Sequence, residues 1–183
     1  MIDFKKVFVD TAPFIYFIEK DSNNPEYYEK VKGFFQYGYD NDKNFVSSVI
    51  TLEEYCVFPY RNKEYLYIDM FDRLVRTIDM EVIEISQEIA KKAAQIRAEY
   101  KGFKAMDALQ LAVACLSGCD IFLTNDKQLK QFKGIKCITV DNQNVGSQYF
   151  CGFPAFYFAF GSILVLKSGH FDVSLMSEGT SRQ

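Results

Sequence analysis

Four acidic residues stand where predicted strands end or predicted helices begin. They are Asp10 in VFVDTAPF, Glu54 in SSVITLEEY, Asp107 in KAMDALQLAVA and Asp126 in IFLTND. The carboxyl ends of parallel strands meet at one edge of a sheet, so we expect these side chains to converge there. Two like charges about 5 Å apart repel by roughly 3 kcal/mol at an effective dielectric constant of about 20. Protons or a divalent cation must relieve this repulsion, and an all-oxygen set of ligands favours Mg²⁺ or Mn²⁺.

Each acid also has a simpler structural interpretation. Asp10 can cap the helix that follows it, and Glu54 can be a solvated helix residue. Asp107 suits the first turn of a helix, where the macrodipole favours a negative charge, and Asp126 suits a turn. Taken separately, these interpretations do not explain why all four acids fall at places that an α/β topology would bring together.

Composition limits the other chemistries that the chain could perform. The 183 residues are 49% hydrophobic and 25% charged, which is typical of one globular domain with a sizeable core. The net charge of −3 argues against a general polyanion-binding surface but allows a local basic rim. The sequence has no glycine-rich phosphate loop, and its single histidine, His170, nearly excludes a histidine triad or an ordinary zinc site.

The cysteines predict a reducing cytoplasmic location, because their number is odd, their positions are scattered and no signal peptide precedes them. Cys115 and Cys119 are spaced by one helical turn, and we interpret them as small core thiols rather than metal ligands. The five positions are Cys56, Cys115, Cys119, Cys137 and Cys151.

The elements that must position the acids alternate between strands and helices. This alternation predicts an α/β fold, with a mostly parallel sheet of about five strands flanked by helices on both faces. The strands are expected at residues 5–10, 45–49, 77–85, 121–124 and 136–140. The helices are expected from Thr11, at residues 26–39, from Thr51 to Pro59, at residues 63–75, from Ser86 to about Gly102, and at residues 105–116.

The pattern changes after residue 142, so we expect a domain of residues 1–142 followed by an extension of residues 143–183. Residues 149–166 form an uncharged apolar run, YFCGFPAFYFAFGSILVL, and the residues after them are polar. This length is marginal for a membrane span, and Gly152, Pro154 and Gly161 weaken it. A loosely packed or partner-bound extension is therefore favoured over a membrane contact, and a tail unrelated to the function of the domain is the third alternative.

The four motifs together resemble the signature segments of PIN domains, in the same order along the chain. The resemblance covers about residues 5–142 and is greatest to the small ribonuclease toxins of VapBC-type toxin–antitoxin pairs. It implies that Asp10, Glu54, Asp107 and Asp126 bind Mg²⁺ or Mn²⁺ and are catalytic. It also implies auxiliary roles for Thr124 and Asn125, which match the polar residues before the last acid.

The function implied by this resemblance is metal-dependent endoribonuclease activity, with RNA as the substrate and an antitoxin protein as the cognate partner. Whether the chain also forms a homodimer is left open by the sequence. One alternative is a catalytically silent PIN-like module that binds RNA or protein. A phosphatase of the DxD type is disfavoured, because Ala12 occupies the second acidic position of that motif. Candidate RNA contacts beside the motifs are Arg61, Lys63, Lys104 and Lys127.

A partner surface is expected on the helices at residues 12–19 and 51–75. These segments contain more apolar residues than a small sheet needs to cover it, and exposed apolar patches mark interaction sites. The residues that we expect to contribute are Phe14, Tyr55, Phe58, Tyr65 and Tyr67.

Overall fold

The computed structural model describes residues 3–20 and 24–142, and within them five parallel strands form one sheet. The strand order is β3-β2-β1-β4-β5, so β1 is central and pairs with both β2 and β4. This arrangement confirms the predicted α/β fold. The strands are β1 (Lys6–Val9), β2 (Asn44–Ser48), β3 (Glu81–Ile83), β4 (Ile121–Thr124) and β5 (Lys136–Thr139).

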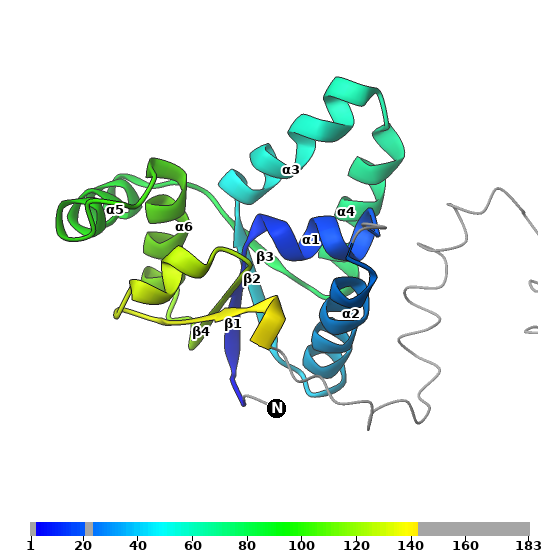
Figure 1. The fold of residues 1–183 in the computed structure, drawn as a ribbon, viewed down its shortest axis with the longest axis horizontal. Coiled ribbons are helices and arrows are strands. Elements are labelled where there is room, and N and C mark those ends of the chain that lie inside the picture. Colours follow the sequence, from blue (N-terminus) through cyan, green and yellow to red (C-terminus); the bar gives the residue numbers. More distant parts are fainter. Residues whose placement is uncertain (1–2, 21–23, 143–183) are drawn as a thin grey trace, which may run out of the picture.

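Helices cover both faces of this sheet, with α1 to α4 on one side and α5 and α6 on the other (Figure 1). Short 3-10 helices follow β4 and β5. The α-helices are α1 (Thr11–Ile18), α2 (Pro25–Asp40), α3 (Val49–Asn62), α4 (Tyr65–Thr77), α5 (Gln87–Glu99) and α6 (Ala105–Leu116). The 3-10 helices are η1 (Lys127–Gln131) and η2 (Val140–Asn142).

The central part of β1 is apolar on both faces because helices bury each face of the sheet. In β1, Val7 and Val9 belong to the core beneath α1 to α4, whereas Phe8 belongs to the core beneath α5 and α6. The ring of Phe8 stacks on that of Phe122 in β4, with centroids 4.8 Å apart. The two central strands are thereby fixed side by side, and so are the residues at their carboxyl ends.

The predicted boundaries of the third strand and of the third helix were wrong. The third strand is shorter than residues 77–85, because the helical spacing of α4 continues to Thr77 and Asp79 then takes a left-handed conformation with φ of 49°. Pro59 does not end α3, which continues to Asn62. Pro59 lacks the N–H that would donate to the carbonyl of Tyr55, so one helical hydrogen bond is lost, but α3 ends only where Lys63 adopts φ of 60°.

Three predictions concern the cysteines, a membrane span and the extension. Cys56, Cys115, Cys119 and Cys137 are free thiols. No helix in residues 3–20 or 24–142 has the length and apolar character needed to span a membrane. The apolar run at residues 149–166 and the rest of the 143–183 extension lie outside the described residues.

Candidate active site

The first and fourth acids follow two strands, β1 and β4, that are neighbours in the sheet. Asp10 directly follows β1, and Asp126 comes two residues after the end of β4. The Asp10 backbone N–H donates to the carbonyl of Leu123 at 2.9 Å, which extends the β1–β4 ladder to the acid itself. The direction of strand addition reverses between β1 and β4, which is where open α/β sheets bind ligands.

Each oxygen of the Asp10 carboxylate accepts one hydrogen bond. Its Oδ1 accepts from the backbone N–H of Thr11 at 2.7 Å, so Asp10 caps α1, and its Oδ2 accepts from the Thr124 hydroxyl at 2.5 Å. The simpler interpretation of Asp10 as a helix cap is therefore confirmed. It is compatible with a functional role, because an N-cap carboxylate also lies at the carboxyl end of the strand before the helix.

The pKa of Asp10 is raised well above the ordinary value for an aspartate. Asp10 is only half-buried as a residue, but its carboxyl group is largely removed from water, and this desolvation raises its pKa to about 6. The two hydrogen bonds oppose the rise, and the negative charges of Glu54 and Asp107 add to it. Three of the four predicted acids are thus close enough to influence one another, and strongly perturbed carboxylates of this kind are typical of functional sites.

Glu54 reaches the site from α3 and is held by residues of two other helices. Its Oε2 accepts from the Thr11 hydroxyl at 2.5 Å and from the Gln110 side-chain amide at 2.9 Å. Thr11 therefore contacts two acids, Asp10 through its backbone and Glu54 through its side chain. The sequence predicted Thr11 only as the start of the first helix, and it did not identify Gln110.

Asp107 lies in the first turn of α6, where its Oδ2 accepts from the Lys104 backbone N–H at 3.3 Å. Asp126 instead caps η1, since its Oδ1 accepts from the Gln128 N–H at 2.7 Å. The acids whose charges most raise the pKa of Asp10 are Glu54 and Asp107. Asp126 is connected to the group indirectly, through its backbone N–H, which donates to the Thr124 hydroxyl at 3.0 Å.

Asn125, the second predicted auxiliary residue, is oriented by α1. Its Nδ2 donates to the Tyr16 hydroxyl at 2.6 Å. Its Oδ1 is buried and has no hydrogen-bond partner within the described part of the chain. A buried acceptor of this kind is suited to bind water or a ligand, because leaving it unsatisfied costs free energy.

The donor atoms fit a hard divalent cation in type and charge, since all of them are carboxylate oxygens. Their spacing is not that of a preformed site: across residues 3–20 and 24–142, no three or more His, Cys, Asp or Glu side chains lie together closely enough to hold a metal ion. Two of the acids are instead held by threonine hydroxyls, Asp10 by Thr124 and Glu54 by Thr11.

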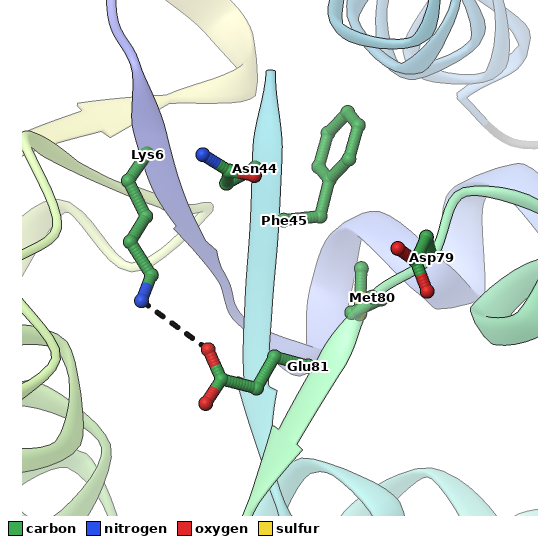
Figure 2. A pocket seen from close by; sticks show the side chains of 6 residues that line it. All are labelled: Lys6, Asn44, Phe45, Asp79, Met80 and Glu81. Carbon is green, nitrogen blue, oxygen red and sulfur yellow. Dashed lines mark hydrogen bonds and ion pairs between the residues drawn. The ribbon is translucent and has the colours of Figure 1, made fainter. Parts of the chain in front are cut away.

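A pocket of about 520 Å³ lies elsewhere, at the amino ends of β1, β2 and β3 (Figure 2). Because the strands are parallel, this is the edge of the sheet opposite the acids. Its one cation, Lys6, forms an ion pair with Glu81 at 3.2 Å, and the other lining residues offer no second charge pair or nucleophile. The better candidate for the active site is therefore the edge at the carboxyl ends of the strands, which we call the acidic edge after Asp10, Glu54, Asp107 and Asp126. The lining residues are Lys6, Asn44, Phe45, Asp79, Met80 and Glu81.

The fold is that of a known class. Residues 7–135 match the sequence model of the PIN domain, and the chain belongs to this family. The membership confirms the family expected from the four acidic motifs. No curated protein matches the sequence.

Solved structures with a similar fold contain toxin–antitoxin chains. A chain of a toxin–antitoxin complex from Klebsiella pneumoniae is 23% identical, with 73% of this chain and 97% of that chain covered and a TM-score of 0.56. A chain of VapBC2 from Rickettsia felis, bound to a promoter DNA fragment, is 19% identical, with 73% of this chain and 98% of that chain covered and a TM-score of 0.57. A chain of DNA-bound VapBC from Salmonella typhimurium is 25% identical, with 74% of this chain and 98% of that chain covered and a TM-score of 0.53. These similarities agree with the fold described above.

Proposed function

We propose that this chain is a Mg²⁺- or Mn²⁺-dependent endoribonuclease and the toxin of a toxin–antitoxin pair. The observation that carries the proposal is the desolvated carboxylate of Asp10, which lies where the strand order reverses and is electrostatically coupled to Glu54 and Asp107. Membership of the PIN family and the fold shared with toxin–antitoxin chains support it.

The residues proposed to hold the cation are Asp10, Glu54, Asp107 and Asp126. When bound, a divalent ion at such a site neutralises the acids, polarises a phosphodiester and lowers the pKa of a bound water. The chain itself contributes orientation. The Thr124 hydroxyl fixes Asp10, and Asn125 presents a buried acceptor oxygen, so both are proposed as auxiliary residues.

RNA is the proposed substrate because the exposed cations next to the motifs can contact a phosphate backbone. Lys104 directly precedes α6 and Lys127 directly follows Asp126, so both lie beside the acids in sequence. The side chain of Lys127 is 74% exposed, and it pairs with Asp141 at 3.0 Å. Arg61 and Lys63 are exposed at the end of α3, farther along the helix from Glu54.

An antitoxin is the proposed partner, and exposed apolar residues on α3 and α4 support a binding site there. Phe14 and Tyr55 belong to the core, so the expectation that they form a partner surface was wrong. Phe58 and Tyr65 are 47% and 56% exposed, at the end of α3 and the start of α4. This α3–α4 surface comprises the exposed residues Val57, Phe58, Tyr60, Tyr65 and Leu66.

The alternative function is a PIN-like module that binds RNA or protein without cleaving it. The separation of the acids in the described residues favours this alternative more than any other observation does. The two functions are distinguished by incubating the purified chain with a mixed RNA pool in Mg²⁺ or Mn²⁺, and in parallel with EDTA. We expect cleavage that EDTA abolishes. RNA binding without cleavage in either metal would instead establish the binding module.

A further inference from the structure

Gln110 is a buried polar residue in the middle of an apolar helix. It is 2% exposed and lies on α6, among three alanines, Leu111 and Val113, which belong to the core. Buried amides need hydrogen-bond partners, because an unsatisfied one costs free energy. The placement of Gln110 three residues after Asp107 puts both side chains on the same side of α6.

The partner of Gln110 is Glu54, on a different helix. The Gln110 Nε2 donates to the Glu54 Oε2 at 2.9 Å, and the Thr11 hydroxyl donates to the same oxygen at 2.5 Å. Neither bond uses Oε1. Donors from α6 and α1 thus hold one oxygen of a carboxylate on α3 and leave the other oxygen for a ligand. An amide provides this restraint without adding a charge to a cluster that is already acidic.

We infer that Gln110 is a positioning residue that holds Glu54 in the orientation needed for cation binding at the acidic edge. This inference rests on the proposed function, since it assigns a role within the same site. Partners that hydrogen-bond to a metal-binding carboxylate typically change metal affinity or activity by about 10- to 100-fold when removed. Gln110 acts only through Glu54 and does not itself bind the cation.

The test is a double-mutant cycle that measures Mn²⁺ binding by isothermal titration calorimetry, without RNA. Gln110→Met keeps the length of the side chain and removes the donor. We expect it to weaken Mn²⁺ binding by about tenfold or more. In a Glu54→Gln background the same substitution should not weaken Mn²⁺ binding any further, because the carboxylate that Gln110 holds is already absent. Gln95→Leu, at an exposed amide on α5, is the matched control and should bind Mn²⁺ as the wild type does.

The outcomes separate this inference from the proposed function. If the wild type binds Mn²⁺ and Gln110→Met binds it equally well, the inference is wrong and the proposed function stands. An equal loss in the Glu54→Gln background would also overturn it, because Gln110 would then act on folding rather than through Glu54. If the wild type binds no Mn²⁺, both are contradicted. Should Gln110→Met not fold, Gln110→Asn, which keeps the amide but shortens its reach, gives the same comparison.

Discussion

The hydroxyl of Thr124 lies 2.5 Å from Oδ2 of Asp10 and joins the last residue of β4 to the acid that follows β1. These two strands are neighbours at the centre of the sheet. Thr124 is completely buried, and its hydroxyl also accepts from the Asp126 backbone N–H. One side chain therefore fixes the first acid and sets the path of the chain into the fourth. We expect the position of Asp10 to be rigid.

The raised pKa of Asp10 predicts a specific dependence of stability on pH. Its folded-state pKa is about 6, against an ordinary value of 3.8, so the folded protein binds the proton more tightly than the unfolded chain. Without metal, this group should therefore lower the free energy of unfolding as pH rises from about 4 to 6. The loss is on the order of 2 to 3 kcal/mol. Asp10→Asn should remove it and be more stable than the wild type at pH 7, but not at pH 4.

Urea unfolding in EDTA at pH 4, 5, 6 and 7 measures this effect, with the wild type and Asp10→Asn compared at each pH. Carboxylates that do not interact with Asp10 titrate equally in both proteins, so they cancel in the difference. A constant difference between the two proteins across this range would show that the pKa of Asp10 is not raised.

Metal binding should stabilise the folded chain. A ligand that binds only the folded state at ten times its Kd adds about 1.4 kcal/mol, which raises the Tm by roughly 3–6 °C for a domain of this size. We expect such a shift with millimolar Mg²⁺ or Mn²⁺ in differential scanning calorimetry, and no shift in Asp10→Asn. An unchanged Tm in both metals would count strongly against a cation site at the acidic edge.

The α3–α4 surface should bind the antitoxin. Replacing Phe58 and Tyr65 together by serine removes two exposed aromatic side chains, and aromatic anchors commonly dominate interface energies. We expect affinity for a small protein encoded beside this gene to fall at least about tenfold, measured by co-purification and titration. Leu116→Ser, at an equally exposed apolar residue on α6, is the control. Equal retention of the partner by both variants would place its binding site elsewhere.

Truncation after Asn142 should leave a folded domain with its activity intact. All five described strands and all four acids precede this residue. Removing the apolar run at residues 149–166 should also raise the soluble fraction, since exposed apolar sequence promotes association. Far-UV circular dichroism, soluble yield and RNA cleavage of the two forms give the comparison. An unfolded truncated chain would mean that the domain extends beyond residue 142.

The sheet was predictable from sequence because its strands are short apolar runs bounded by turn or cap residues. Phe8 and its neighbours in β1 are buried on both faces, and such a run identifies a central parallel strand without knowledge of its partners. The third strand was less predictable. The apolar residues near Ile78 continue the pattern of α4, and only tertiary packing shows where the helix ends.

The site was predictable to the level of the acids but not of the residues that hold them. Asp10 and Asp126 follow strands, so their edge of the sheet could be foreseen. The contacts of Thr11 and Gln110 with Glu54 depend on how three helices pack, and no local sequence pattern encodes that packing. One signal was available: Gln110 interrupts an apolar stretch at a helical spacing from Asp107, which marks a buried polar side chain in need of a partner.

We propose that the coupled carboxylates around Asp10 take part in RNA cleavage with the help of a cation. This proposal is tested by the cleavage of a defined RNA in Mn²⁺ by the wild type, Asp10→Asn and Asp107→Asn, with Glu88→Gln, at an exposed acid on α5, as the control. Loss of several kcal/mol of transition-state stabilisation should reduce the rate at least about 100-fold in both site variants, and the control should keep it. A well-folded Asp10→Asn protein that cleaves RNA at the wild-type rate would contradict the claim.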